Sequence, residues 1–353
     1  MKLIHCADLH LDARMESSLS KEKAKERRLE LLRTFTRMVE QAAADGVDAV
    51  LICGDLFDAK TVSARAGNCV LDAVRQHPQM IFYYLQGNHD QNSFLKDLAV
   101  IPENLKTFRE DWTSYALGDV VVTGAEASDG AWEGLADRLI LDTDRVNIVM
   151  LHGMVTEYGG GGFSLRSYRG RKIDYLALGH IHSYRQEKLD DRGIWCYPGC
   201  LEGRGFDECG LKGYVLLEIM DKQVKAQFVP FAERTLHEVS VDVTGLLTQE
   251  EICRAVKAEL DGIPAGDLVK IVLRGEVPPE AEKDADWLRG WLEHDYYHLR
   301  VKDETRLLIC PEDYQYDISL KGEFVRQVLA SGMTLEEKEQ VLRLGIRALA
   351  GED

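Results

Sequence analysis

The chain has 353 residues, of which 45% are hydrophobic and 29% charged, a composition that excludes a fibrous or wholly disordered protein. Its formal net charge is −17 at pH 7, and most of that charge falls after residue 230, so affinity for nucleic acid would require a local basic area earlier in the chain. There is no apolar run of about 18 residues and no signal-peptide pattern at the start, so we expect a cytoplasmic protein without a membrane span.

In chain order, the first 230 residues alternate short apolar runs with longer amphipathic stretches, as is typical of strands joined by crossover helices. This pattern predicts helices over 21–44 and 64–75. It predicts strands over 2–6, 49–53, 80–86, 119–124, 146–151, 175–178 and 213–219. The order of these elements indicates an α/β fold for about the first 230 residues.

The pattern changes after residue 230. Segment 234–310 has three strand-like stretches around a helix that begins after Thr248, which predicts a small α+β domain. Segment 318–353 has two helical patterns, and Thr334 followed by Glu337 is a capping-box start for the second. We therefore expect three parts, with the first covering residues 1–230.

The eight cysteines are scattered, with no Cys-x-x-Cys pair. Several lie in apolar, strand-like runs, where a thiol behaves as a small hydrophobic side chain. We expect reduced cysteines, mostly in the core, and neither disulfides nor a zinc cluster.

Side chains suited to metal binding follow five of the predicted strands, where each strand ends. In open α/β sheets, ligands bind at the edge formed by the carboxyl ends of the strands. Any one of these motifs has an ordinary explanation as a turn, a helix N-cap or a hydrogen-bonded core histidine. Five of them in one order indicate a shared site. The residues are Asp8 and His10; Asp55 and Asp58; Asn88, His89 and Asp90; His152; and His180 and His182.

The motifs Asp-x-His, Gly-Asp-x-x-Asp, Gly-Asn-His-Asp, His and Gly-His-x-His, in this order, resemble the calcineurin-like metallophosphoesterase superfamily. The resemblance implies a β-sandwich flanked by helices and a centre of two divalent ions that hydrolyses phosphoesters. By the match, Asp55 would bridge the two ions. The other ligands would be Asp8, His10 and His182 for one ion, and Asn88, His152 and His180 for the other.

The same resemblance gives His89 and Asp58 different roles. His89 would lie over the substrate phosphate, stabilise its charge and protonate the leaving oxygen. Asp58 would orient His89 and hold its protonated form. Asp90 is expected to form hydrogen bonds within its loop and is not assigned to catalysis. Manganese is implied as the metal, and this ligand set would also accept iron, zinc or magnesium.

Three further segments resemble the SbcD branch of nuclease subunits, which is related to the Mre nucleases: IHCADLHLD, IDYLALGHIHS and WCYPGCLEGRGFDECGLKGYVLLEI. This likeness covers about residues 1–225. It implies DNA as the substrate, a capping domain over 234–310, a homodimer, and a C-terminal helical segment that binds an SbcC-like coiled-coil ATPase. The pattern of the branch is matched by Tyr197, Pro198, Gly199, Glu208, Lys212 and Gly213.

Other functions stay open. One is a phosphoesterase for small nucleotides or other phosphoesters, and another is a non-catalytic DNA-binding or scaffold subunit, which the complete ligand set disfavours. The C-terminal helices carry an apolar face. This face fits binding of the ATPase, and it fits equally well packing of the helices on their own domain. A glycine run followed by Arg166, Arg169, Arg171 and Lys172 is the best candidate for contact with a phosphate backbone, against the alternative of a solvated loop. The loop after His10 lacks the glycine common in the Mre relatives, so DNA contacts of that loop cannot be carried over.

Overall fold

In the computed structural model, the chain divides into two compact units, Met1–Thr235 and Leu236–Asp353. No helix within the described ranges is long and apolar enough to cross a membrane. The described residues are 1–15, 18–58, 62–90, 95, 100–126, 132, 134–156, 162–278, 281–308 and 314–350.

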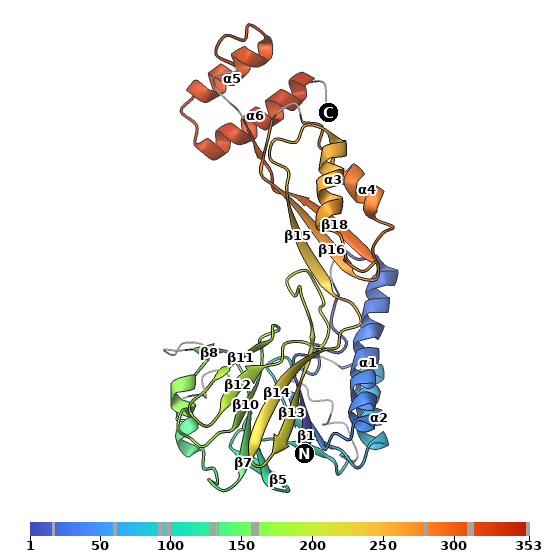
Figure 1. The fold of residues 1–353 in the computed structure, drawn as a ribbon, viewed down its shortest axis with the longest axis vertical. Helices are drawn as coiled ribbons and strands as arrows, with labels where there is room; N and C mark the ends of the chain where they lie inside the picture. Colours follow the sequence, from blue (N-terminus) through green and yellow to red (C-terminus); the bar gives the residue numbers. More distant parts are fainter. Residues whose placement is uncertain are drawn as a thin grey trace. The chain divides into compact units, whose positions relative to one another are not determined.

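The first unit is a sandwich of two six-stranded sheets (Figure 1). In the first sheet, the four strands from β1 to β4 run parallel, β13 pairs antiparallel with β1, and β14 pairs antiparallel with β13. In spatial order its strands are β14 (Gln223–Pro230), β13 (Gly213–Met220), β1 (Lys2–Cys6), β2 (Ala49–Cys53), β3 (Ile81–Leu85) and β4 (Leu105–Thr107).

The second sheet has a parallel centre of four strands and an antiparallel strand at each side. A short parallel pair, β8 (Val155–Thr156) and β9 (Phe163–Ser164), and two 3-10 turns, η1 (Ala136–Arg138) and η2 (Leu165–Tyr168), lie in its connections. In spatial order its strands are β11 (Arg185–Lys188), β12 (Ile194–Tyr197), β10 (Tyr175–Gly179), β7 (Val146–His152), β6 (Val120–Gly124) and β5 (Thr113–Leu117).

Strand β2 shows how the sequence builds these layers. Val50 and Ile52 pack toward α1 (Lys21–Ala44) and α2 (Ala64–Gln76), which cover the outer face of the first sheet. Leu51 and Cys53 point to the opposite face and pack against the second sheet, because side chains alternate along a strand. A strand buried on both faces is apolar throughout, as this one is.

The second unit has a parallel sheet in the order β15 (Leu236–Asp242), β16 (Leu268–Arg274) and β18 (His298–Asp303). Two helices pack on it, α3 (Gln249–Glu259), which begins with a capping box at Thr248, and α4 (Ala285–Leu292). A small parallel pair, β17 (Glu276–Val277) and β19 (Arg306–Leu307), follows. The chain then forms α5 (Leu320–Ala330) and α6 (Leu335–Ala350), which pack on each other.

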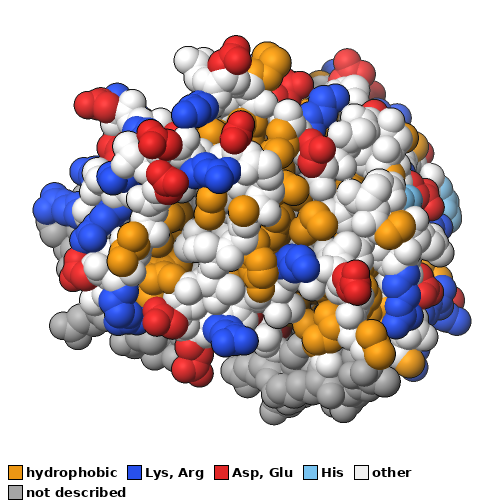
Figure 2. All heavy atoms as spheres, turned by 90° about the horizontal axis from the view of Figure 1, so that it is seen from below, with side chains coloured by type: hydrophobic (Ala, Val, Ile, Leu, Met, Phe, Trp, Pro, Cys, Tyr) orange, Lys and Arg blue, Asp and Glu red, His pale blue; other side chains and the backbone are white. Residues whose placement is uncertain are grey.

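The structure confirms the α/β class and the strands and helices predicted for the first unit, with ends that differ by at most one residue. Within the described residues it adds elements that were not predicted: α4 and nine strands, β4, β5, β8, β9, β11, β12, β14, β17 and β19. Most of them are short or half-exposed, and such segments carry a weak apolar pattern. No disulfide links any of the seven described cysteines, and Cys310 lies outside the described residues. Acidic and basic side chains are interspersed on the face shown in Figure 2.

Candidate metal centre

The predicted site residues lie at the carboxyl ends of five strands: β1, β2 and β3 of the first sheet, and β7 and β10 of the second. His152 is the last residue of β7, and the others lie on the loops that follow their strands. The site therefore spans the carboxyl ends of two stacked sheets, whereas a single sheet edge was the expectation from sequence. The loops after β1 and β2 run side by side, since the amides of Asp8 and His10 donate to the carbonyls of Gly54 and Asp55.

Several residues here have the positive φ that side chains with a Cβ seldom adopt. Values are 51° at Asp8, 43° at His10, 50° at Asp55 and 109° at His180. Strained backbone of this kind is typical of functional sites, because the surrounding structure must stabilise it.

The glycine of each Gly-containing motif allows two loops to approach. A Cβ at Gly54 would overlap the His152 ring, and a Cβ at Gly87 would overlap the Asp55 carboxylate. A Cβ at Gly179 would overlap the carbonyl of Cys53. The glycines before the aspartate, asparagine and histidine motifs are therefore required by packing between chain segments that are distant in sequence.

One group of candidate ligands consists of Asp8, His10 and His182, whose ligand atoms all lie within 4.8 Å of one another. Asp8 and His10 are fully buried. The Nε2 atoms of His10 and His182 face each other at 3.2 Å. The backbone amide of His180 donates to both oxygens of Asp8, at 2.9 and 3.0 Å, and so fixes the orientation of this carboxylate.

A second group consists of Asp55, His152 and His180. Asn88 joins it, since its Oδ1 lies 3.0 Å from His152 Nε2 and 3.3 Å from His180 Nδ1. Asp55 faces both groups: its Oδ2 lies 3.3 Å from His152 Nε2 and 3.9 Å from His10 Nε2. The carboxylate that the resemblance assigns to two ions thus lies between the two sets of ligands.

The donor atoms fit divalent transition ions. His152 Nδ1 lies 2.9 Å from the carbonyl of Cys53, and His182 Nδ1 lies 2.7 Å from Glu208 Oε1. Both partners accept a hydrogen bond from Nδ1, so Nε2 is the atom with which each of these histidines would bind a metal ion. Imidazole nitrogens combined with carboxylate and amide oxygens suit manganese, iron or zinc.

The electrostatics show that this cluster requires positive charge. Burial raises the pKa of Asp8 to about 7, although the charges of His152 and His182 oppose the shift. Burial also acts to raise the pKa of Asp55, but the hydrogen bond and charge of His152 lower it to about 2. Burial acts to lower the pKa of His152, and the hydrogen bond with Asp55 and the charges of both aspartates raise it to about 9. Buried carboxylates need a proton or a metal ion as a partner.

His89 and Asp58 lie beside these groups. His89 Nδ1 is 2.9 Å from Asp58 Oδ1, and the His89 side chain is 48% exposed. His10, Asp58 and His89 also lie close enough to hold a metal. Asp90 has a different position: it is buried, and its carboxylate accepts the backbone amides of Leu56, Phe57 and Gly87. It braces the loops after β2 and β3, as expected from the sequence.

Sequence reasoning missed Arg204 and gave Glu208 no chemical role. The Arg204 guanidinium lies between Asp58 and Glu208, and the carboxylate of Glu208 contacts His182. The only signal was their place in the segment that matches the SbcD branch. In the basic loop, Arg171 pairs with Asp137 at 2.5 Å, and residues 159–161 of the glycine run lie outside the described residues.

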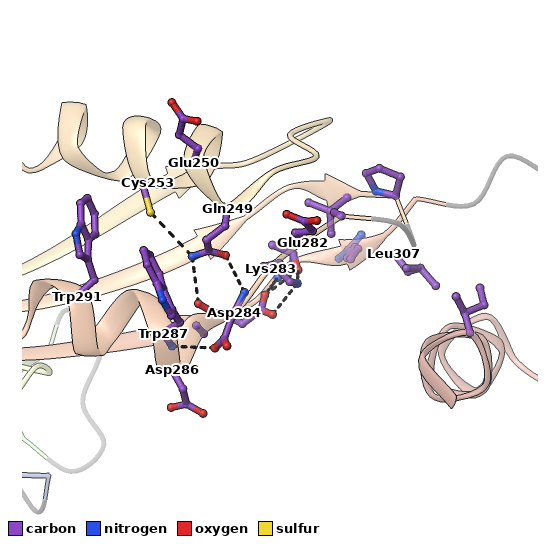
Figure 3. Close-up of a pocket in the computed structure, with 18 residues that line it drawn as sticks. Gln249, Glu250, Cys253, Glu282, Lys283, Asp284, Asp286, Trp287, Trp291 and Leu307 are labelled. Carbon is purple, nitrogen blue, oxygen red and sulfur yellow. Dashed lines mark hydrogen bonds and ion pairs between the residues drawn. The ribbon is translucent and has the colours of Figure 1, made fainter. Parts of the chain in front are cut away.

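A pocket of about 1060 Å³ lies in the second unit and contains none of the predicted site residues (Figure 3). Its wall includes Trp287 and Trp291, whose rings stack 5.8 Å apart. Lys283 in this pocket is paired with Asp303 at 2.6 Å. The remaining charges of the lining are Arg306 and the four acidic residues Glu250, Glu282, Asp284 and Asp286. An acidic lining of this kind does not suit an anionic phosphoester.

Comparison with known proteins identifies relatives. Residues 1–184 match the family model for calcineurin-like phosphoesterase. The chain is 27% identical over 337 residues to the uncharacterized metallophosphoesterase YhaO of Bacillus subtilis, which covers 86% of this chain and 82% of that protein. It is 24% identical over 309 residues to the DNA double-strand break repair protein Mre11 of Aeropyrum pernix, with 78% and 74% covered. A crystal structure of a dimetal phosphatase from Danio rerio aligns with TM-score 0.42 and 10% identity, over 64% of this chain and 98% of that one.

Proposed function

Because the chain belongs to the calcineurin-like phosphoesterase family, we propose that this metal-dependent phosphoesterase is a two-metal phosphodiesterase that cleaves DNA. The observation that carries the proposal is the position of Asp55 between two groups of metal-binding side chains, with the exposed His89 beside them. DNA is preferred as the substrate because several relatives are DNA double-strand break repair proteins.

In this proposal, Asp55 would hold both ions. When bound, two divalent ions would supply Lewis acidity and would activate a water molecule for attack on phosphorus. The chain's own contribution is geometric: backbone bonds hold Asp8, and the Cys53 carbonyl and Glu208 orient two of the histidines. The remaining ligands are Asp8, His10 and His182 on one side, and Asn88, His152 and His180 on the other.

His89 transfers a proton in the proposed reaction. Asp58 accepts a hydrogen bond from Nδ1 of His89, which orients the ring and leaves Nε2 to donate to the leaving oxygen. Because the His89 side chain is about half exposed while Asp8, His10 and Asp55 are buried, a large substrate reaches His89 more easily than the ligands. This exposure agrees with a role for His89 as an acid that contacts the substrate, and His89 is not needed as a metal ligand.

We further propose that the ions are manganese, that the chain acts as a cytoplasmic homodimer, and that α5 and α6 bind an SbcC-like coiled-coil ATPase. The two helices share a small core that includes Val325 and Leu342. They leave Leu320, Leu335 and Leu344 72%, 77% and 69% exposed. These exposed leucines offer apolar surface to a partner, beside the core in which the two helices pack on each other.

The net charge of −17 and the pairing of Arg171 with Asp137 favour a second candidate, a phosphodiesterase for small nucleotides. A short substrate needs fewer basic contacts than a DNA backbone.

One assay separates the two candidates. The purified chain is incubated with manganese and end-labelled single-stranded or linear duplex DNA, beside a small chromogenic phosphodiester and a His89→Ala control. DNA cleavage that is lost in the control supports a nuclease, and its products reveal exonuclease or endonuclease action. Turnover of the small diester without DNA cleavage supports the second candidate, and no turnover of either substrate contradicts both.

A further inference from the structure

Arg204 joins the two sides of the candidate centre. Its Nη2 lies 2.7 Å from Glu208 Oε1 and its Nη1 lies 3.4 Å from Asp58 Oδ2. The side chain is only 17% exposed. A guanidinium offers several donors in one rigid plane, so a single arginine can bind two carboxylates at once, which a lysine does poorly.

On one side, Glu208 contacts a candidate ligand. Its Oε1 accepts a hydrogen bond from Nδ1 of His182 at 2.7 Å. Its Oε2 accepts a hydrogen bond from the backbone amide of Arg204, also at 2.7 Å. The Nε and Nη2 atoms of Arg204 also donate to this carboxylate. Arg204 therefore fixes the carboxylate that sets the tautomer and direction of the His182 ring.

On the other side, one carboxylate oxygen of Asp58 lies near two histidines. Its Oδ1 lies 2.9 Å from His89 Nδ1 and 3.6 Å from His10 Nδ1. His10 Nδ1 is buried and has no hydrogen-bond partner among the described residues, so it competes for the same oxygen. Arg204 attracts the second oxygen, Oδ2, and thereby restricts rotation of the Asp58 carboxylate.

The loop that carries Arg204 has its own rigid support. Arg27 on α1 donates to the carbonyl of Gly203 at 2.7 Å and pairs with Glu202 at 3.4 Å. Glu202 also accepts the hydroxyl proton of Thr34 at 2.7 Å. Arg27, Glu202 and Thr34 are all fully buried. Because buried charges with satisfied partners resist displacement, the backbone at Arg204 is held firmly against α1.

We propose that Arg204 is a positioning residue that holds Asp58 on His89 and Glu208 on His182, and so couples the proton donor to one metal position. The inference rests on the proposed function, since it assigns Arg204 a role in that reaction. It predicts two separate defects when Arg204 is lost: weaker metal binding through His182, and weaker protonation of the leaving group through His89.

The test uses Arg204→Met, which keeps much of the side-chain volume without the charge. Manganese affinity is measured by calorimetry, and hydrolysis is measured on two diesters of one nucleotide, a p-nitrophenyl ester and a methyl ester. Nitrophenolate leaves without help, whereas methoxide needs a proton. We expect manganese affinity to fall about tenfold or more. We expect kcat for the methyl ester to fall at least about tenfold further than kcat for the nitrophenyl ester.

Four further variants make the result specific. His89→Ala is expected to lose only the methyl ester, and Glu208→Gln to weaken mainly manganese binding. Arg192→Met is the matched control, because Arg192 pairs with Asp174 just before the amino end of β10, opposite the site. It is expected to change neither quantity. Arg204→Lys keeps the positive charge but lacks the planar guanidinium that can bind two carboxylates. It is expected to show both defects in weaker form.

The outcomes are distinct. If Arg204→Met shows both defects while Arg192→Met shows neither, the inference stands. If Arg204→Met shows one defect or none, or loses both esters equally, the inference is wrong. If Arg204→Met does not fold, Arg204→Lys decides by the same criteria. If the wild-type chain binds manganese but hydrolyses neither ester and does not cleave DNA, the proposed function is wrong. Manganese affinity of Arg204→Met then still tests the contact of Arg204 with Glu208.

Discussion

The Nδ1 atom of His89 lies 2.9 Å from Oδ1 of Asp58, so a contact between side chains joins the loop after β3 to the loop after β2. The amide of His89 also donates to Asp55 Oδ1 at 2.9 Å. One residue thus contacts both the carboxylate between the metal groups and the carboxylate that holds its own ring. This arrangement places a proton donor beside the centre without making it a ligand, and it leads to the first prediction.

Replacement of His89 by alanine is expected to lower the rate of DNA cleavage by about 10²–10⁴-fold, the usual contribution of a general acid. Manganese affinity should stay within about twofold, since the proposed ligands remain. Gel assays of labelled DNA and calorimetry check the two parts. His294→Ala, at a histidine side chain that is 88% exposed, is the control. Unchanged cleavage in His89→Ala would refute the role given to His89.

Manganese is expected to stabilise the fold through Asp55. At about 100 times its dissociation constant, one bound ion adds about 2.7 kcal/mol to the free energy of unfolding. Asp55→Asn should lose most of this gain, because Asp55 faces both ligand groups. Urea unfolding with manganese or with a chelator measures the difference. The exposed Asp242 provides the control variant Asp242→Asn, and an equal gain in Asp55→Asn would contradict the assignment.

Asp90→Ala is expected to destabilise the first unit by about 3 kcal/mol, because three backbone amides lose a buried carboxylate. Asp90→Asn should cost less, since its single carbonyl oxygen can still serve the amides of Leu56 and Gly87. Urea unfolding checks both variants. Asp119→Ala, at a side chain that is 91% exposed, should change stability by less than about 0.5 kcal/mol. If Asp90→Ala is as stable as this control, the hydrogen bonds of Asp90 do not stabilise the fold.

His5 is expected to make the fold less stable as the pH falls below about 6.5. It is fully buried, its Nδ1 lies 2.8 Å from the Tyr175 hydroxyl, and burial lowers its pKa to about 3. Between pH 6.5 and 3 the unfolded chain therefore binds a proton that the folded chain does not, so the free energy of unfolding decreases with falling pH.

Between pH 6 and 5, the wild type should lose roughly 1 kcal/mol more than a His5→Gln variant. Urea unfolding at the two pH values measures this difference in slope, which does not depend on the absolute stability of the variant. His294→Gln controls for the removal of a histidine. Equal slopes in the wild type and His5→Gln would show that His5 does not contribute.

The sequence alone determined the local elements and the chemical types at the site. Segments buried on both faces, such as β2, are apolar throughout, and α3 and α6 begin at the capping boxes of Thr248 and Thr334, so local patterns were enough to predict them. The order of aspartate, asparagine and histidine motifs likewise indicated a metal centre, because each motif is contiguous in the chain.

Only the tertiary structure decided how these motifs meet. It places β7 and β10 in a second sheet, so that His152 and His180 reach Asp55 across the sandwich. It also brings Arg204 between Asp58 and Glu208. Contacts of this kind depend on which faces two sheets bury against each other, and a periodic pattern within one segment carries no record of its distant partner.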